Sequence, residues 1–433
     1  MTADRGRSGA ILISVGDELL LGRTVDTNAT WIGRGLADRG IRVSRGYRVR
    51  DDDGEIGRAL IEACEQAALV VLTGGLGPTH DDHTREAVAG ALGLELEPRA
   101  DVLAHLEEYY TTRDREFPEI ARKIGLVHQG ARAFLNPAGT APAILISHEG
   151  TEILLLPGVP REMRVLFEVA APVILERLSD RLPRVAVRTW LSSGLGESAL
   201  APLVAAALSE ADLADRVEGH PWELAYLPSL RGVGLRATIE ISGQADEEAL
   251  LSRLAQVIEG VIAPWRVAES ATGDVIGALA DILVRTGQSL ATGESCTGGL
   301  VAKRATDLAG SSAWFMGGVV AYSNAAKMNS LGVRETTLEA QGAVSERVAE
   351  EMARGAARVF GADAGIGITG VAGPGGGTLS KPVGTVCYAV AVGSRCEVRK
   401  ERFQGDREAV RERSAQASLM LLLRMLEERE AMS

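Results

Sequence analysis

Two neighbouring nucleophiles stand in the last third of the chain, within Ala291–Lys303. Ser295 carries a hydroxyl, Cys296 carries a thiol, and glycines lie on both sides of the pair. A short apolar run precedes them and a helical pattern follows, which predicts a strand, a tight turn and a helix. The unpaired N–H groups of such a helix N-terminus can hold an anion or a developing oxyanion. The alternative is a plain helix cap, provided by Ser295 or Thr297, with glycines that ease the turn.

A serine nucleophile needs a base, and the last third of the chain contains no histidine, since all six histidines lie at or before His220. Unless another domain or subunit lends one, lysine is the usual substitute. Lys303 is two helical turns from Ser295, which is too far for a hydrogen bond. Lys400 lies in a charged run that we expect to be solvated. Two lysines remain as candidate bases: Lys327 and Lys381. Without a histidine to activate it, Cys296 is expected to be a small packing residue.

A second group of polar residues follows the short apolar run Leu69–Thr73. The segment 74–84 contains glycines that let a phosphate approach the backbone and threonines that donate hydrogen bonds. Its adjacent carboxylates, Asp81 and Asp82, can hold Mg²⁺ or a similar hard cation. Ligands of open α/β sheets bind at the carboxyl ends of strands, where this loop is expected. The alternative is a glycine turn followed by a helix that Asp81 caps.

Strands and helices alternate around both groups, which predicts an α/β fold class. The predicted strands of the first third are 10–15, 41–49 and 69–73, and its predicted helices are 27–36 and 56–68. The predicted strands of the last third are 289–291, 317–322, 362–369 and 383–392. Its predicted helices are 273–286, a helix from the Ser295 turn to 308, 345–360 and 406–428.

The middle of the chain has a different pattern of predicted strands and helices. Strand-like patterns at 185–192 and 233–241 and helical patterns at 197–208 and 245–261 predict a small α+β domain. Its sheet carries few basic residues, which argues against binding of single-stranded nucleic acid. We expect it to serve as a spacer or in dimer packing, followed by a linker at 263–272.

Length and composition set the outer limits. A chain of 433 residues is expected to form two or three domains. Its net charge of −12 argues against general nucleic-acid binding and against binding to anionic membranes. No apolar run approaches the roughly 18 residues that span a bilayer, and none near the N-terminus is long enough for a signal-peptide core. The four cysteines form no CxxC motif, so a reducing cytoplasm is the expected location.

The first third resembles a known family. The motifs are GDELLLG (16–22), DTNA (26–29), TGGLGPTHDD (73–82), NPAGTAPA (136–143) and LLLPGVPREM (154–163). They are similar to the N-terminal domain of the competence/damage-inducible CinA proteins, which is related to the molybdopterin-binding MoaB/Mog fold. The resemblance implies a three-layer α/β domain and metal-dependent hydrolysis of ADP-ribose. It implies Mg²⁺ or a similar divalent cation, with K⁺ as a candidate second cation.

The same resemblance assigns residues. The implied ligand-binding residues are Glu18, Asn28, Gly74, Gly75, Gly77 and Thr79, and the implied metal-side residues are Asp81, Asp82 and Asp17. Asp17 departs from the family pattern, in which many relatives have a small or hydroxyl residue before the glutamate. It either adds a carboxylate to the metal side or caps the turn.

The last third resembles the C-terminal domain of the same family. The motifs are ESCTGG (294–299), GSSAWF (310–315), YSNAAK (322–327), GAVSE (342–346), TGVAGPGGGT (369–378), KPVGTV (381–386) and GDR (405–407). Members of that group are nicotinamide-nucleotide amidases, which need no cofactor. The resemblance implies Ser295 as nucleophile, Lys327 as base and Tyr322 as the residue that orders the lysine. It implies backbone N–H groups around Thr297 and Gly298 as the oxyanion hole. The implied ribose-phosphate residues are Gly299, Gly373, Gly375, Gly376, Thr378 and Arg407.

Together these resemblances imply a multi-domain α/β protein with domains at 1–170, 171–265 and 270–433, the middle one a KH-like connector. They imply a cytoplasmic homodimer that acts on two small nucleotides, nicotinamide mononucleotide and ADP-ribose, and that binds neither nucleic acid nor membrane. The alternative from another class is a scaffold, in which a pterin- or molybdopterin-binding or competence-related protein has no N-terminal catalysis. An intact pair of Ser295 and Lys327 argues against this alternative, because a scaffold has no use for a nucleophile.

Overall fold

The computed structural model describes residues 9–182, 184–214, 216–241, 246–267 and 274–431. The chain folds into two compact units, Met1–Val187 with Thr238–Glu247 and Arg188–Ala237 with Glu248–Ser433. Part of the predicted linker and the predicted helix start at Gly273 lie outside the described residues. The predicted domain boundaries stay predictions.

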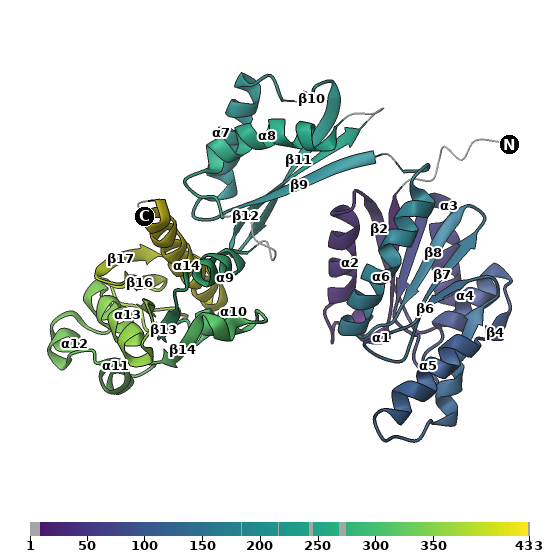
Figure 1. The fold of residues 1–433 in the computed structure, drawn as a ribbon, viewed down its shortest axis with the longest axis horizontal. Coiled ribbons are helices and arrows are strands. Elements are labelled where there is room, and N and C mark those ends of the chain that lie inside the picture. The colour runs from purple at the N-terminus through teal and green to yellow at the C-terminus, as the bar shows by residue number, and fades with distance from the viewer. Residues whose placement is uncertain (1–8, 183, 215, 242–245, 268–273, 432–433) are drawn as a thin grey trace. The chain divides into compact units, whose positions relative to one another are not determined.

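The first unit contains a six-stranded sheet in the order β2-β1-β3-β8-β7-β6, with helices on both faces (Figure 1). The first four strands of this order run parallel, and β7 and β6 run antiparallel to their neighbours. The strands are β1 (Ala10–Val15), β2 (Val43–Val49), β3 (Leu69–Thr73), β6 (Arg132–Phe134), β7 (Ala143–His148) and β8 (Thr151–Leu156), and β4 (Leu96–Pro98) pairs separately with β5 (Leu126–His128). The helices are α1 (Asp17–Leu20), α2 (Thr27–Ala37), α3 (Asp53–Gln66), α4 (Thr84–Leu92), α5 (Ala100–Thr111), α6 (Pro160–Leu178) and the short 3₁₀ helix η1 (Glu119–Gly125).

The continuous apolar runs of this sheet are explained by burial on both faces, as is usual for parallel strands. Along β1, Ile11 and Ile13 pack in one cluster with residues of α3 and α4. The alternate residues, Ala10 and Leu12, pack in another with residues of α2 and α6. The sheet is therefore the middle of three layers, as predicted, and the loops at the carboxyl ends of its parallel strands are free for a site.

The middle of the chain forms a four-stranded sheet in the order β10-β11-β12-β9. Its elements are β9 (Arg184–Ser192), α7 (Glu197–Glu210), β10 (Arg216–Val217), β11 (His220–Ser229), β12 (Gly232–Ile241) and α8 (Glu247–Ile262). Both predicted strands, as β9 and β12, and both predicted helices are present. Strand β11 was not predicted, because Pro221 and Pro228 lie within it and proline is rare inside strands.

The last part of the chain forms a five-stranded sheet in the order β14-β13-β15-β16-β17. The first three run parallel, and β16 and β17 run antiparallel to their neighbours. The strands are β13 (Leu290–Glu294), β14 (Phe315–Val320), β15 (Ala364–Gly370), β16 (Thr385–Val392) and β17 (Arg395–Arg402). The helices are α9 (Val275–Thr286), α10 (Leu300–Thr306), α11 (Asn324–Leu331), α12 (Glu335–Gln341), α13 (Glu346–Phe360), α14 (Arg407–Ala431) and the short 3₁₀ helix η2 (Ser311–Ala313).

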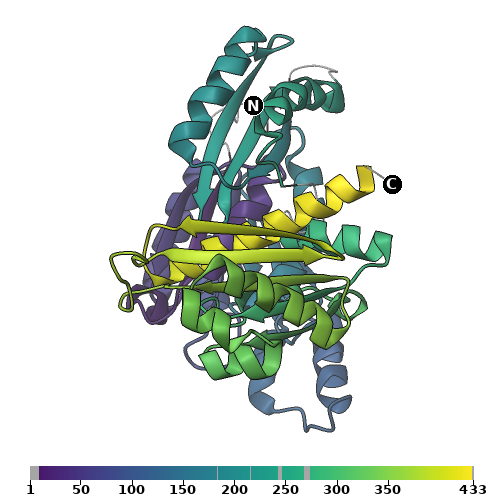
Figure 2. The ribbon, with the colours of Figure 1, turned by 90° about the vertical axis from the view of Figure 1, so that its left-hand side faces the viewer.

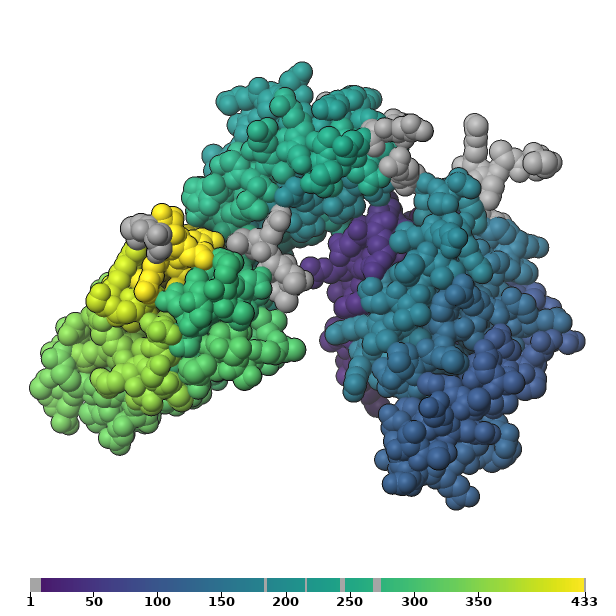
Figure 3. Space-filling model, viewed as in Figure 1, coloured from purple at the N-terminus to yellow at the C-terminus, as the bar shows by residue number. Residues whose placement is uncertain are grey.

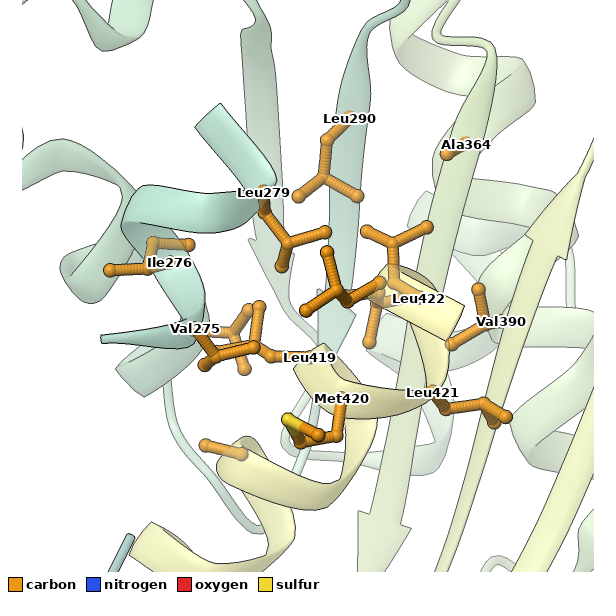
Figure 4. Packing of buried hydrophobic residues seen from close by; sticks show 14 of the residues in the cluster. Val275, Ile276, Leu279, Leu290, Ala364, Val390, Leu419, Met420, Leu421 and Leu422 are labelled. Atoms are coloured by element: carbon orange, nitrogen blue, oxygen red, sulfur yellow. The ribbon is translucent and has the colours of Figure 1, made fainter. Parts of the chain in front are cut away.

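Helices cover both faces of this sheet (Figure 2). On one face, α9 and α14 pack through a large apolar cluster in which Leu279, Leu419 and Leu422 lie against the sheet residues Leu290 and Val390 (Figure 4). On the other face, α13 packs through small residues. The long apolar stripe of α14 therefore anchors the helix along the sheet and fixes the polar residues on its remaining sides.

The charged run around Lys400 forms the edge strand β17, which was not predicted, but Lys400 is exposed in it as expected. One prediction next to this sheet was wrong. The helix after the Ser295 turn begins only at Leu300, five residues beyond the serine. The glycines Gly298 and Gly299, both in the left-handed region with φ of 64° and 88°, extend the turn before that helix begins.

The last turns of α14, in yellow in Figure 3, lie at the surface of the second unit. Although α14 is the longest helix of the described residues, polar and charged side chains interrupt its apolar stripe. Within the described ranges, no helix is long and apolar enough to cross a membrane.

The close packing of α13 on β15 gives a stability prediction. A methyl group at Gly367 would stand 2.2 Å from the carbonyl oxygen of Ala349, which is closer than atoms can approach. We expect Gly367→Ala to lower the free energy of unfolding by about 1–3 kcal/mol, the usual effect of overpacking. Urea denaturation would measure this. Gly375→Ala is the control, since a methyl group there meets nothing within 4 Å; equal stability of the two variants would contradict the packing account.

Candidate active site

Ser295 and Lys327 meet at the carboxyl end of β13. The Nζ atom of Lys327 lies 2.9 Å from Oγ of Ser295 and donates a second hydrogen bond, also 2.9 Å, to the carbonyl oxygen of Ala321. The lysine is 2% exposed and the serine 8%. Lys327 extends from the first turn of α11, whose N-terminus is capped by the Ser323 hydroxyl, an acceptor for the Ala326 N–H at 3.1 Å. A capped helix thus delivers the amine to the serine.

Burial shifts the pKa of both groups beside Ser295. Loss of hydration lowers the pKa of Lys327 from the ordinary lysine value of 10.5, because the charged ammonium is disfavoured away from water. Burial raises the pKa of the neighbouring Cys296 thiol to about 12. A neutral amine can accept the proton of Oγ, whereas a thiol that stays protonated is a poor nucleophile. Cys296 also belongs to the apolar cluster beneath α14, so it packs inward as expected.

The turn that carries Ser295 is held by its neighbours in the sheet. The Ser295 N–H donates to the carbonyl of Ile368 on β15 at 2.9 Å. The buried carboxylate of Glu294 accepts from the N–H groups of Val301 and Ala302 at 3.2 and 2.9 Å. The first amides of α10 are therefore occupied by Glu294. The prediction that this helix N-terminus would hold a ligand anion is corrected accordingly.

The candidate donors of the oxyanion hole also differ from those predicted, because one of the predicted N–H groups is already hydrogen-bonded. The Gly298 N–H donates to the carbonyl of Ser295 at 3.1 Å and closes the turn. The carbonyl of Thr297 accepts from Nε and Nη2 of Arg411 at 3.2 and 2.8 Å. Since the Gly298 amide is used within the turn, the N–H groups of Cys296 and Thr297 are the candidates that remain. Sequence analysis missed Glu294 and Arg411; the position of Glu294 directly before the serine was the available signal.

Tyr322 lies in a different place from the one expected. Its side chain is 61% exposed, and its hydroxyl accepts a hydrogen bond from Nη2 of Arg407 at 2.8 Å. The carbonyl of Ala321, and not Tyr322, holds the lysine amine. The other terminal nitrogen of the Arg407 guanidinium, Nη1, donates to the carbonyl of Gly373 at 2.7 Å. Arg407 therefore joins the segment before Lys327 to the glycine-rich loop.

That loop, 371–384, connects β15 to β16 and exposes Gly375, Gly376 and Thr378 to solvent. The Thr378 N–H donates to the carbonyl of Lys381, and the Lys381 N–H donates back to the Thr378 hydroxyl. The Nζ atom of Lys381 donates to the carbonyl of Gln341 at 2.6 Å. Of the two lysines left open by the sequence, only Lys327 contacts Ser295.

In the first unit, Asp82 organises the loop after β3. Its carboxylate accepts from the N–H groups of Gly77 and Thr79, both at 2.9 Å, and from the Thr79 hydroxyl at 2.5 Å. The fully buried Arg85 donates to the carbonyls of Leu76 and Gly77 at 2.6 and 2.8 Å. The loop is therefore shaped by its own side chains, and the Asp82 carboxylate is engaged within it.

The other residues predicted for this site surround the loop. The side-chain amide of Asn28 donates to the Thr73 hydroxyl and to the carbonyl of Gly158 at 3.2 and 2.7 Å, which ties α2 to two strand ends. Gly74 and Gly75 both have φ in the left-handed region, and a methyl group at either would lie 2.3 Å from a neighbouring oxygen. Glu18 is exposed. These glycines let the loop pass close to β1 and α4.

The predicted metal set of Asp17, Asp81 and Asp82 does not fit an ion in this arrangement. Asp17 accepts from Nε of Arg50 at 3.2 Å, and the exposed Asp81 side chain has its pKa lowered by a hydrogen bond from Thr79. Across the described parts of the chain, no group of three or more acidic, histidine or cysteine side chains could hold a metal. The predicted carboxylates are thus largely occupied by the protein itself.

One carboxylate of this region was not predicted. Burial raises the pKa of Asp51, and the charges of Glu18, Asp17 and Asp81 raise it further. Asp51 also accepts the N–H of Asp17 at 3.0 Å. Its position just after β2, next to the end of β1, was the signal that sequence analysis could have used.

Two models of known protein families match this chain. The family model of the CinA C-terminal domain matches residues 272–426, and that of the probable molybdopterin-binding domain matches residues 11–176. The chain is therefore a multi-domain α/β protein with a MoaB-like N-terminal domain and a CinA C-terminal domain.

The family follows from relatives that match along the whole chain. A CinA-like protein of Salinibacter ruber is 40% identical over 95% of this chain and 97% of its own length. A putative competence-damage inducible protein of Moorella thermoacetica is 39% identical over 96% of this chain and 98% of its own. The chain belongs to the CinA family. Among solved structures, CinA of Thermoplasma acidophilum is 40% identical and covers 39% of this chain and 98% of its own, with a TM-score of 0.37.

The lowered lysine pKa gives a prediction that needs no natural substrate. We expect phenylmethanesulfonyl fluoride to modify Ser295 at a rate that rises with pH and levels off below pH 10.5, as Lys327 loses its proton and can accept that of Oγ. Mass spectrometry of the modified peptide would follow the rate. In Lys327→Met, which has no amine to titrate, the rise should disappear. A wild-type rate that is independent of pH would contradict the role of the lysine as base.

Proposed function

We propose that the C-terminal domain is a serine–lysine amidohydrolase that converts nicotinamide mononucleotide to nicotinate mononucleotide and ammonia. The observation that carries the proposal is the 2.9 Å contact between the buried Lys327 amine and Ser295 Oγ. Lys327 is buried, it donates to a serine hydroxyl, and it has no hydrogen bond to a carboxylate of the described residues. Such a lysine suits proton transfer better than structural support.

The steps follow from this pair. The neutral amine of Lys327 takes the Oγ proton as Ser295 attacks the carboxamide carbon, and the C–N bond breaks when the lysine returns that proton to the leaving nitrogen as ammonia. Water, activated by the same amine, then hydrolyses the Ser295 ester. The N–H groups of Cys296 and Thr297 are proposed to stabilise the oxyanion.

The choice of substrate rests on family resemblance together with the residues around the pair. The exposed guanidinium of Arg407, held between Tyr322 and Gly373, stands at the glycine-rich loop and suits a ribose phosphate. We assign phosphate recognition to Arg407 and to the loop residues Gly375–Thr378. The proposal includes a cytoplasmic location and a homodimer, as the resemblance implies.

Substitutions at the pair test the mechanism. We expect Ser295→Ala to lower ammonia release from nicotinamide mononucleotide by at least about a thousandfold, as for the loss of other nucleophiles. Lys327→Arg should lose nearly as much, because arginine keeps the charge but cannot act as a base. Cys296→Ala is the matched control and should retain most of the activity. Full ammonia release by Ser295→Ala would exclude a serine ester.

As a second activity we propose hydrolysis of ADP-ribose by the N-terminal domain with a divalent cation. The observation that favours it is the Gly74–Thr79 loop, shaped at the carboxyl end of β3 by Asp82 and Arg85. The predicted carboxylates do not form an ion site as they stand.

A chelator separates the two proposed activities. With EDTA, we expect release of AMP from ADP-ribose to stop, because it requires the cation, while ammonia release from nicotinamide mononucleotide continues. Chromatography of both products from one sample would measure this. If ADP-ribose stays intact with added Mg²⁺ or Mn²⁺, the scaffold alternative with a pterin-binding N-terminal domain is favoured for that part of the chain.

A further inference from the structure

A cavity of about 790 Å³ lies within the second unit, away from Ser295. One wall is α14 together with β16 and β17, and the other is formed by the loop after β9, the turn between β11 and β12, and Trp265. Its size is within the range of natural small-molecule sites. Arg411, which holds the Ser295 turn, and Gln416, which lines the cavity, both belong to α14.

Gln416 is the first sign that the cavity takes a ligand. The residue is 2% exposed, and its Oε1 atom accepts a hydrogen bond from Nη2 of Arg304 at 2.9 Å. Because arginine only donates, this contact fixes the orientation of the amide. Nε2 is then left buried, and among the described residues it has no hydrogen-bond partner. A buried donor without an acceptor is unfavourable, and a ligand with a carbonyl oxygen or a ring nitrogen would satisfy it.

Two of the arginines that line the cavity can take an anion. Arg413 and Arg424 line it, and within the described ranges neither forms an ion pair; they donate to the carbonyls of Gln404 and Pro264. Three of the lining carboxylates are engaged: Glu397 binds Arg395 and the lining Arg399, Glu428 binds Arg395, and Glu401 accepts from the Tyr388 hydroxyl. The fourth, Glu197, is exposed.

Apolar and aromatic side chains complete the wall between the two arginines. Arg413, Met420 and Arg424 follow one another at helical spacing, so they share one face of α14. Figure 4 shows Met420 and Leu421 beside the core residues of the same helix. Trp265 and Phe403 line the cavity as well. Flat aromatic rings and thioethers are suited to packing against a planar heterocycle.

We propose that this cavity binds a nucleotide. The base packs against Trp265, Phe403 and Met420, Gln416 Nε2 donates to an acceptor on the base, and Arg413 or Arg424 holds the phosphate. The site is separate from the Ser295 pair and does not depend on the function proposed for that pair.

Calorimetric titration of the full chain tests this, with AMP as the probe. We expect AMP to bind, and adenosine, which has no phosphate, to bind at least about tenfold more weakly. Gln416→Glu keeps the oxygen that accepts from Arg304 and removes the buried donor, and it should weaken AMP binding by a similar factor. Arg413→Met or Arg424→Met should do the same, and the double variant more so.

Two controls locate the binding. Arg429→Met removes a charge from the same helix outside the cavity, and Arg407→Met removes the arginine proposed for the Ser295 site; both should leave this AMP affinity unchanged. Thermal melting would show that each variant is folded. The proposal is overturned if AMP does not bind at millimolar concentration, if Arg407→Met alone abolishes binding, or if the Gln416 and double-arginine variants bind AMP like the wild type.

Discussion

The removal of one lysine amine from water is the constraint on which the C-terminal site depends. Burial disfavours the charged ammonium and lowers the pKa of Lys327. The amine donates to a hydroxyl and a carbonyl, and among the described residues it has no hydrogen bond to a carboxylate that would favour the charged form. That environment makes the amine a base. The capped start of α11 and the hydrogen bond of Ser295 to the sheet hold the side chains of Lys327 and Ser295 in contact.

A carboxylate serves the same purpose in the two glycine-rich turns. After β13, the carboxylate of Glu294 satisfies the helix amides, so the serine beside it is left to react. After β3, Asp82 satisfies the amides of its own loop, and the charges nearest Asp51 are those of Glu18, Asp17 and Asp81. In both cases a carboxylate next to a motif stabilises the turn. Motif position alone therefore does not separate residues that shape a loop from residues that act on a ligand.

Much of the architecture was predictable because it depends on local patterns. Apolar runs and helical spacing located the central strands, and the absence of histidine from the last third left two lysines, one of which contacts Ser295. What could not be predicted depends on contacts between distant segments. The Tyr322 hydroxyl meets Arg407, which is 85 positions away. No local pattern encodes that pairing, because it is set by how α14 packs across the sheet.

The charged composition of strand β17, which is unusual for a strand, has a consequence in the folded protein. Its eight residues include arginines, glutamates and a lysine, and it forms the outer border of the five-stranded sheet. Such a border offers unpaired backbone groups to any other extended chain, and dense charge of both signs is a known defence against that encounter. These charges made the strand hard to predict from the sequence. In the folded protein they disfavour pairing of this edge with another chain, and thereby aggregation of the C-terminal domain through its sheet.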